Sequence, residues 1–473
     1  MKILRYIIVF VLFGSLLSSC MMGPSFQKPV VQSPDHFIGE QTVSDSIDLK
    51  WWETFNDPVL DTMVIHALEY NLDLKMAAKR IEQARAYWGM TKADMWPSID
   101  IQAGAGRGNF GGGMKSGSTT NNFYITPSLS WELDFWGKYR RLSESAQADL
   151  LASEWALRSM QISLISDMTS LYFQLLDYQK RLEISQKTVE LRFNSLKIIK
   201  MRFEEGIVPE IDVNQAEAQW AIAVASVPSY ERAIAQTQYV ISILLGENPR
   251  YFMQPNTLDD QKVLEDIPAG LPSQLLQRRP DIAQAEMQYK SQNAQVGAAI
   301  AARFPSISIT GLMGAASNDL STLTTGGLAW SAGASLLGPI FNFGKNKRRV
   351  EVEKRKAEEM LLNYEAVVLQ AFKEVEDALI SISTYKKELE AREIYFSSTA
   401  NAAKLSALRY DKGVTSYLEV LENERSSFEA ELILTQTYQE LLNSYVDLYK
   451  ALGGGWLTKQ EEVNYQSELQ NTQ

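Results

Sequence analysis

The residues that could perform covalent or metal chemistry are few in this chain of 473 residues. It contains one cysteine, Cys20, and two histidines, His36 and His66. A structural zinc site takes about four Cys or His ligands and a disulfide takes a pair of cysteines, so one chain can form neither. Neither histidine lies near a Gly-x-Ser-x-Gly nucleophile pattern. We therefore predict no catalytic residue, no metal site and no cofactor, and we expect that the chain is not an enzyme.

Cys20 ends a segment with the features of an export signal. Lys2 and Arg5 precede an apolar run over residues 7–17, which is too short to span a bilayer. The letters Leu-Ser-Ser-Cys that end at Cys20 resemble the lipobox of bacterial lipoproteins. The resemblance implies a signal peptide over residues 1–19 and a covalent lipid on Cys20. The alternative is an ordinary signal peptide whose cleavage site happens to hold a cysteine.

The residue after the cysteine bears on the destination of such a lipoprotein. It is Met21 and not aspartate, so the usual signal for retention in the inner membrane is absent. Several acyl chains make a stable anchor where one is marginal. We therefore expect a protein anchored by lipid in the outer membrane of a Gram-negative bacterium and extending into the periplasm.

Charge and composition exclude two further classes of protein. The chain has 46 Lys and Arg against 57 Asp and Glu, for a formal net charge of −11, and it has no long basic run. We therefore predict no nucleic-acid partner. Hydrophobic residues make up 45% of the chain, which is typical of a folded protein and not of a disordered one.

The chain is a tandem repeat of a unit of about 200 residues. Several landmarks recur at an offset of 207 or 208 residues, which is the pattern of a duplicated architecture. The matched landmarks are Trp96-Pro97-Ser98-Ile99 with Phe304-Pro305-Ser306-Ile307, Phe135-Trp136-Gly137-Lys138 with Asn342-Phe343-Gly344-Lys345, and Arg202-Phe203-Glu204-Glu205-Gly206 with Arg409-Tyr410-Asp411-Lys412-Gly413.

Each repeat contains two segments in which apolar and polar residues alternate. We expect strands at about 98–106, 123–135, 306–314 and 328–337. An apolar face and a polar face over about ten residues are typical of a transmembrane β-strand, although a half-buried soluble sheet has the same pattern. Four strands cannot close a barrel in lipid, so two, three or four chains must share one.

The connections between these strands are rich in Gly, Ser and Thr, and we expect loops at 107–122 and 316–327. Residues 106–111 fit the pattern Gly-x-Gly-x-x-Gly. A dinucleotide site requires a helix that begins at this pattern, and the chain continues with further glycines instead. We therefore interpret the pattern as an exposed loop.

Two very long helices follow the strands. Residues 138–204 and 345–411 lack internal Pro and Gly after their first positions and are rich in helix-forming residues. A helix of about 67 residues is about 100 Å long, which is typical of an extended body and not of a globular core. Gly206 and Gly413 then mark turns, and return helices are expected at 210–245 and 417–452.

The mature chain therefore divides into five parts. We predict, in order, a lipidated N-terminal segment at 20–58, the first repeat at 59–247, a linker at 248–272, the second repeat at 273–452 and a C-terminal tail at 453–473.

Four motifs resemble those of the TolC-like outer-membrane efflux proteins, in their OprM/NodT-type lipoprotein branch. The resemblance covers essentially the whole mature chain, and the combination of motifs is specific. The motifs are Trp-Trp-Glu-Thr-Phe-Asn-Asp-Pro-Val-Leu at 51–60, Gly-Pro-Ser-Phe at 23–26, Arg-Arg-Pro-Asp-Ile at 278–282, and Gly-Pro-Ile-Phe-Asn-Phe-Gly at 338–344.

The resemblance implies a mostly helical fold with a membrane β-barrel part. Three chains would form a homotrimer, with four strands per chain in one 12-stranded β-barrel and with an α-helical barrel that continues it across the periplasm. Residues 248–272 and the tail would form a belt around the helices. The family implies a passive exit duct of a tripartite efflux pump for small molecules such as drugs and toxic compounds. Its partners would be outer-membrane lipid, a periplasmic adaptor (membrane fusion protein) and an inner-membrane transporter of the RND type.

The resemblance also implies a gate at the periplasmic end of the duct. Two acidic residues three apart, just after the second turn, ring the narrowest point in the family, and the matching residues are Glu419 and Glu422. At a separation of about 6 Å and an effective dielectric of about 20, like charges repel by about 3 kcal/mol. In a trimer this repulsion would attract cations and raise the pKa of some of the carboxyl groups.

Further residues of the gate follow from the same match. Tyr410 corresponds to a tyrosine that helps to latch the closed tip, and Asp212 is a candidate for the constriction. The turns at Gly206 and Gly413 would contact the adaptor. Two alternatives stay open, namely an exit duct for a protein secretion system and a lipid-anchored coiled-coil structural protein that conducts nothing.

Overall fold

The computed structural model describes residues 21–34, 36–38, 50–111, 114–252, 256–262, 272–325 and 328–454. Cys20 and the predicted signal peptide lie outside these residues, so the lipid on Cys20 stays a prediction. Most of the predicted tail also lies outside them. Among the helices of the described chain, none combines the length and the apolar character that crossing a bilayer would require.

The chain forms two compact units, each built from segments that are distant in sequence. The first unit consists of residues 1–31, 79–154 and 283–366. The second consists of residues 32–78, 155–282 and 367–473. Each unit therefore draws on both repeats, which follows from a duplication in which the two copies pack against each other.

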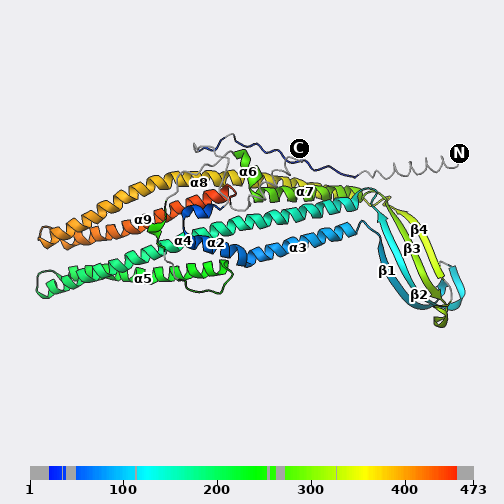
Figure 1. The fold of residues 1–473 in the computed structure, drawn as a ribbon, viewed down its shortest axis with the longest axis horizontal. Coiled ribbons are helices and arrows are strands. Elements are labelled where there is room, and N and C mark those ends of the chain that lie inside the picture. Colours follow the sequence, from blue (N-terminus) through cyan, green and yellow to red (C-terminus); the bar gives the residue numbers. More distant parts are fainter. Residues whose placement is uncertain are drawn as a thin grey trace. The chain divides into compact units, whose positions relative to one another are not determined.

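The first unit contains an antiparallel sheet of four strands in the described chain, in the order β1-β2-β3-β4 (Figure 1). Helices α3 (Leu72–Ala93) and α7 (Pro280–Ala301) precede the strand pairs of the first and the second repeat. The pairing of β2 with β3 joins the repeats into one sheet. The strands are β1 (Ser98–Gly111), β2 (Met114–Leu133), β3 (Ser306–Ser317) and β4 (Leu328–Leu337).

One face of this sheet is apolar across all four strands. Leu129 pairs with Ile99 on one side and with Gly311 on the other, and Gly311 pairs with Ala332. Side chains alternate between the faces of a strand, so this register aligns the apolar positions of every strand. The large side chains of this face are exposed, including those of Ile99, Ile101, Met313, Leu328, Trp330 and Leu336.

The opposite face is mostly small and polar. Ser130 pairs with Thr310, and Thr310 pairs with Gly333. The remaining positions of this face include Ser98, Asp100, Gln102, Thr126, Ser128, Ser306, Ser308, Ser331 and Ser335. The sheet therefore has the two unlike faces that the alternation predicted.

The loop predicted at 107–122 is wrong. β1 continues to Gly111 and β2 begins at Met114, so the two strands form one long hairpin with an irregular register between Gly108 and Phe110. Gly and Asn have a low intrinsic preference for strands, so the pairing with the neighbouring strand is what keeps this stretch extended. The alternation of apolar residues stops at this point in the sequence, but the pairing of the strands does not.

The predicted end of the second strand, residue 135, also needs correction. β2 ends at Leu133 because Asp134 serves the following helix instead. Its carboxylate accepts hydrogen bonds from the backbone N–H groups of Tyr139 (2.9 Å) and Arg140 (3.0 Å). A carboxylate in this position satisfies N–H groups that the first turn of a helix leaves free.

The second unit is built around two helical hairpins of matched length. In each repeat a helix of 67 residues is followed by a turn and a helix of 35 residues (Figure 1). The long helices also contribute their first turns to the first unit. The helices are α4 (Lys138–Glu204), α5 (Glu210–Leu244), α8 (Lys345–Asp411) and α9 (Tyr417–Ala451).

The core of the second unit is aromatic and centres on the segment before α2 (Pro58–Tyr70). The short helix η1 (Trp51–Phe55) buries three of its side chains. The Trp51 ring stacks on the ring of Tyr449 at 5.0 Å between centroids, and the Phe55 ring meets Phe173 edge-on at 4.9 Å. These contacts tie the N-terminal segment to both repeats, since Phe173 lies on α4 and Tyr449 on α9.

The linker between the repeats is held to this core by a buried carboxylate, that of Asp57. Only 1% of Asp57 is exposed, and five groups donate hydrogen bonds to it. Two of the donors lie in the linker, beside η2 (Leu258–Asp260) and ahead of α6 (Pro272–Arg278). The five donors are the backbone N–H groups of Val59 (2.9 Å) and Leu60 (3.2 Å), the side-chain amides of Asn256 (2.7 Å) and Gln261 (2.8 Å), and the hydroxyl of Tyr172.

These donors control the ionisation of Asp57. Burial alone would raise its pKa, but the hydrogen bonds from Tyr172, Asn256 and Gln261 outweigh burial and hold the pKa below its ordinary value. A carboxylate with a lowered pKa contributes stability above its ordinary pKa and loses it as the pH falls through the lowered value. The contribution of Asp57 is therefore present at neutral pH and disappears only in acid, below about pH 4.

We predict that Asp57→Asn lowers the free energy of unfolding by about 2–4 kcal/mol at neutral pH. The NH2 group of asparagine replaces one carboxylate oxygen and cannot accept the hydrogen bonds that this oxygen receives. Chemical denaturation of the full chain measures the change. Asp61→Asn on the same helix is the control, since burial, Glu53 and Asp57 raise the pKa of Asp61. Loss of that charge should leave stability unchanged or slightly higher, and equal losses for the two variants would contradict the role of Asp57.

Candidate functional site

The turns of the two hairpins have the same construction. Gly206 and Gly413 adopt φ of +73° and +71°, a conformation that residues with a Cβ rarely take. The N–H of Ile207 reaches back to the carbonyl of Arg202 (2.8 Å), and the N–H of Val414 reaches that of Arg409 (2.9 Å). These bonds close the long helices. Nothing lies within 4 Å of where a Cβ would stand on either glycine, so both turns are open to solvent.

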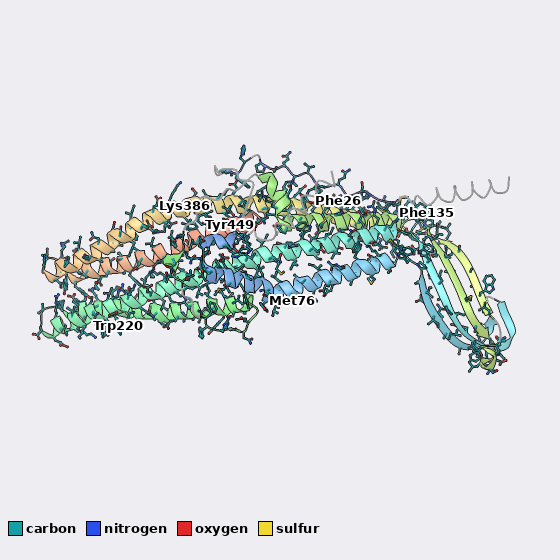
Figure 2. All side chains as sticks on the ribbon, viewed as in Figure 1. Phe26, Met76, Phe135, Trp220, Lys386 and Tyr449 are labelled. Carbon is teal, nitrogen blue, oxygen red and sulfur yellow. The ribbon has the colours of Figure 1, made fainter. Side chains whose placement is uncertain are left out.

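A small apolar cluster joins the two hairpins close to these turns. It is separate from the aromatic core, and Tyr417, at the start of α9, is one of its buried members. Trp220, on α5 (Figure 2), packs against this cluster, and so does Tyr410 from α8. The buried members are Leu196, Ile199, Ala216, Tyr417, Val420 and Leu421.

Tyr410, predicted as a latch, lies at the contact between the repeats. The guanidinium of Arg202 lies 5.0 Å from the centre of the Tyr410 ring, and it forms an ion pair with Asp411 at 3.1 Å. Tyr410 and Asp411 hold the pKa of Arg202 above its ordinary value. The Tyr410 ring also packs against that of Tyr417 at 5.3 Å. Arg202, from the end of α4, therefore links the first hairpin to the second.

Glu419, predicted for the acidic ring, is already paired within its own hairpin. Its carboxylate lies 3.2 Å from the Arg409 guanidinium and accepts a hydrogen bond from the Thr415 hydroxyl. Arg409 occupies the same position in the second repeat as Arg202 in the first. The two arginines nevertheless have different partners, since Arg202 reaches the other repeat and Arg409 closes its own turn.

Glu422 lies one turn further along α9, on the same face as Glu419 because the two are three residues apart. Its side chain is 62% exposed and pairs with Arg425, whose Nε lies 3.3 Å from the carboxylate. Arg425 lowers the pKa of Glu422. In the single chain each predicted ring residue therefore has an arginine partner, and the local acidic charge is largely balanced.

Asp212 lies in the first turn of α5 and is half-buried. Burial raises the pKa of the Tyr417 hydroxyl, and the charges of Glu424 and Asp212 add to the effect. Asp212 and Tyr410 therefore both lie near Tyr417. Tyr417 and the arginines that pair with the glutamates are residues that the sequence analysis did not single out.

The described residues were also compared with the ligand groups that metal ions require. Within the ranges that the structure describes, no group of three or more His, Cys, Asp or Glu side chains is placed to hold a metal ion.

Comparison with known proteins gives the family of this chain. The model of the family described as "Outer membrane efflux protein" matches residues 64–247 and 271–454, which correspond to the two repeats. The solvent efflux pump outer membrane protein SrpC of Pseudomonas putida is 35% identical over 94% of this chain and 97% of its own length. The cation efflux system protein CusC of Escherichia coli O6:H1 is 32% identical, over 93% and 96% of the two chains.

Solved structures give the same result. The outer-membrane channel OprN superposes with a TM-score of 0.85 at 30% identity, covering 92% of this chain and all of that one. The Campylobacter jejuni CmeC outer membrane channel superposes with a TM-score of 0.84 at 27% identity, over 96% and 99% of the two chains. The chain belongs to the outer membrane efflux protein family, which confirms the resemblance. It is an outer-membrane component of an efflux pump.

We predict that Gly206→Ala and Gly413→Ala each lower the free energy of unfolding by about 1–2 kcal/mol, because a Cβ strains a left-handed turn even where space is free. Thermal or chemical unfolding of the full chain measures the loss. Gly89→Ala in helix α3 is the control, since its Cβ would also meet open space but its backbone is helical. That change should raise stability by about 0.5–1 kcal/mol. The same sign of change at all three glycines would contradict this account.

Proposed function

We propose that three copies of the chain form a passive duct across the outer membrane and the periplasm. The apolar face that runs through all four strands would face lipid, the polar face would line a barrel of twelve strands, and the helices would continue that barrel. The observation that carries the proposal is the exposure of this apolar face, with Ile99, Trp330 and Leu336 each more than 70% exposed. A surface of this kind is stable against lipid and not against water.

The proposed duct works with two partners. A periplasmic adaptor would bind the open turns at Gly206 and Gly413, and an inner-membrane transporter of the RND type would supply the energy. The names of relatives as outer-membrane parts of efflux pumps support this arrangement. The cargo would be small molecules, since relatives are named for solvents, toluene, cations and antibiotics.

Two further parts of the chain have proposed roles. Cys20 would carry the lipid anchor, which is supported by the lipobox and by a relative named a probable outer membrane lipoprotein, SilC of Salmonella typhimurium, 32% identical over 97% of this chain. The linker at 248–272 would form part of a belt around the helices. Three hydrogen bonds that hold the linker to the helices support this role. Asn256 and Gln261 donate to Asp57, and the Tyr438 hydroxyl donates to the Gln261 carbonyl (2.6 Å).

The gate of the proposed duct is the region of the two turns. Glu419 and Glu422 of three chains would form stacked acidic rings, while Arg202 would hold the hairpins of each chain together through Tyr410 and Asp411. Opening would separate the hairpins and break this link. The arginine partners of the glutamates reduce the charge of the closed ring, and movement of the hairpins would change that balance.

We predict that Glu419→Gln combined with Glu422→Gln reduces the cation selectivity of the pore, because the variant removes the acidic charge of the constriction. Conductance of the purified protein in a planar bilayer, with reversal potentials under a salt gradient, measures this. Glu351→Gln combined with Glu358→Gln is the matched control, since both residues pair with an arginine three positions earlier on α8, as Arg425 pairs with Glu422 three positions before it.

The control pair should keep the selectivity of the unmodified protein. Unchanged selectivity in the Glu419 and Glu422 variant would move the constriction elsewhere and leave the duct intact. A protein that has the mass of a trimer but never conducts, even when Arg202→Ala removes the link between its hairpins, would contradict the proposed duct itself.

We further predict that Arg202→Ala increases the conductance of the resting pore several-fold, because it removes the link between the hairpins. An exposed ion pair contributes only about 0.2–1 kcal/mol, so the unfolding free energy should change little. Arg348→Ala is the control, since this exposed arginine pairs with Glu351 within helix α8 and touches neither turn. An equal rise in conductance for both variants would contradict the assignment of the latch to Arg202.

A further inference from the structure

A cavity of about 420 Å³ lies among the helices of the second unit. Its lining comes from α4, α8 and α9, and the linker adds Leu258 and Asp259 of η2. The volume falls in the range of about 300–1,000 Å³ that is typical of sites for small molecules. The proposed duct gives this cavity no role.

The linker side of the cavity is held in place by several contacts. Leu258 is buried in the aromatic core of the second unit. The backbone N–H of Thr257 and its hydroxyl both donate to the Asp260 carboxylate (2.8 Å each), which caps η2. The Asp259 carboxylate accepts a hydrogen bond from the Lys180 ammonium (2.6 Å). A cavity whose walls are already fixed binds a ligand at a lower cost than one that must first form.

The lining combines an apolar part with carboxylates. The hydroxyl of Tyr438 is already engaged with the Gln261 carbonyl, so Tyr438 offers the cavity its ring. The carboxylates are those of Asp259, Glu393 and Glu431, and Lys180 is the one basic residue among the described residues of the lining. The apolar part consists of Ile184, Leu258, Leu389, Phe396 and Leu434.

Two of these carboxylates have no partner in the part of the chain that the structure describes. No described residue forms a hydrogen bond or an ion pair with the carboxylate of Glu393 or of Glu431. Lys180 pairs instead with Asp259 and, at 3.5 Å, with Glu183. Burial raises the pKa of Glu431, and the nearby lysines offset this effect only in part. The cavity therefore has negative charge that the described chain leaves unpaired.

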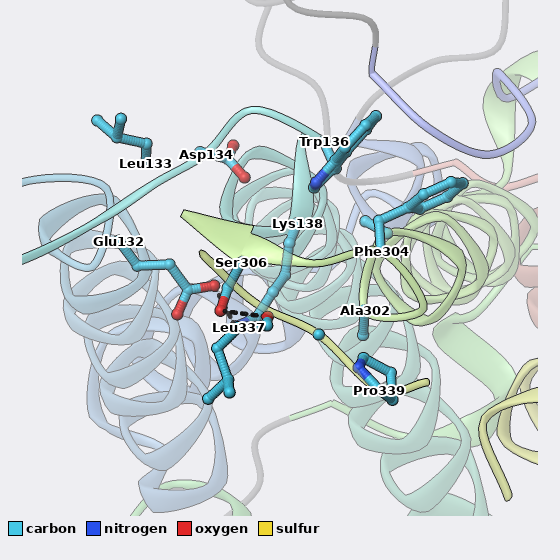
Figure 3. A pocket seen from close by; sticks show the side chains of 12 residues that line it. Glu132, Leu133, Asp134, Trp136, Lys138, Ala302, Phe304, Ser306, Leu337 and Pro339 are labelled. Atoms are coloured by element: carbon cyan, nitrogen blue, oxygen red, sulfur yellow. Dashed lines mark hydrogen bonds and ion pairs between the residues drawn. The ribbon is translucent and has the colours of Figure 1, made fainter. Parts of the chain in front are cut away.

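A cavity of about 450 Å³ in the first unit, beside the ends of β2 and β4, gives a contrast (Figure 3). There the Lys138 ammonium donates a hydrogen bond to the Glu132 carboxylate (3.0 Å), and the Arg140 guanidinium pairs with Asp134 (3.0 Å). The charged groups of that lining satisfy one another, as groups removed from water usually do. The cavity of the second unit differs because two of its acidic groups are not satisfied in this way.

The packing of the hairpins does not require these two carboxylates. The hairpins of the two repeats have helices of equal length, 67 and 35 residues, at an offset of 207. At that offset Glu393 corresponds to Gln186 and Glu431 corresponds to Val224. A neutral side chain is therefore compatible with the same hairpin at both positions. The carboxylates occur only in the hairpin whose residues line this cavity.

We propose that this cavity binds a small organic cation, an amine whose ammonium group pairs with Glu393 and Glu431 and whose apolar body fills the space between α4, α8 and α9. The rings of Phe396 and Tyr438 add the attraction of an aromatic face for a cation. The carboxylates repel an anion, and a neutral molecule leaves them unpaired. Among the described residues no group of acidic side chains is placed to hold a metal ion. The inference goes beyond the proposed duct, since binding here requires neither a barrel nor a partner protein.

Protection of a cysteine in the lining tests the site in the purified full chain. Leu434→Cys places a thiol in the cavity, and 1-adamantylammonium should slow its alkylation by a maleimide. 1-Adamantanol and 1-adamantanecarboxylate have the same apolar body, and each should require at least about a tenfold higher concentration for the same protection. Lys373→Cys, at an exposed position of α8 outside the cavity, should react equally fast with and without the amine. The unmodified chain sets the background from Cys20.

Removal of the two carboxylates tests the pairing. Glu393→Gln combined with Glu431→Gln, in the Leu434→Cys background, should raise the amine concentration for half-protection about tenfold, because charge-assisted hydrogen bonds are lost. Glu388→Gln combined with Glu429→Gln is the matched control. These residues lie on the same two helices, pair with Arg392 and Arg425, and do not line the cavity. The control should leave protection unchanged.

Thermal unfolding gives a second measurement that needs no added cysteine. Because a ligand stabilises the folded state to which it binds, 1-adamantylammonium should raise the unfolding midpoint of the unmodified chain. It should not raise the midpoint of the variant that carries Glu393→Gln and Glu431→Gln.

Three outcomes would overturn the inference. They are equal protection by the amine and the alcohol, an equal effect of the two double glutamine variants, and the absence of both protection and a shift of the midpoint. Each of them would leave the proposed duct standing, because neither measurement depends on a pore.

Discussion

A four-stranded sheet with an apolar face and two unpaired edges is not stable alone in water or in lipid. Water penalises the exposed side chains of the apolar face, and lipid penalises the unpaired N–H and C=O groups of β1 and β4. Lipid on one face and further strands on both edges satisfy both demands together.

The contacts that stabilise the core of the second unit lie within one chain. Asp57 collects five donors from α2, from α4 and from the linker, and the surrounding aromatic residues exclude water. A buried charge costs several kcal/mol unless it is paired, so these donors define one arrangement of the linker. The linker is therefore fixed to the middle of the helical part, while the turns are joined by a small apolar cluster and by an exposed ion pair, and the ion pair contributes little.

Much of this fold could be predicted from the sequence because its signals are local and long. The long helices occupy 138–204 and 345–411 as expected, since unbroken helix-forming segments end at glycines that need positive φ. The four strands were found from alternation. Their extension past Gly106 was not, because Gly, Asn, Ser and Thr carry no alternation and the pairing depends on the neighbouring strand.

The candidate site shows where such prediction stops. Tyr410, Glu419 and Glu422 were selected by a motif, but nothing local indicates that Arg202 pairs with Asp411, a residue 209 positions away. Its equivalent, Arg409, also lies four residues before the turn glycine, but its partner is Glu419 of its own hairpin. Contacts of this kind depend on packing, and a single sequence does not record packing.

The small side chains of the polar sheet face have a consequence for traffic through the proposed duct. Hydroxyl groups and glycines, with few charges among them, offer a passing molecule contacts no better than those it makes with water. A lining that does not bind the passing molecule cannot be saturated. The flux should therefore rise in proportion to the concentration gradient, and different cargoes should not compete with one another. Saturation and competition would then arise only upstream, where molecules are bound before they enter.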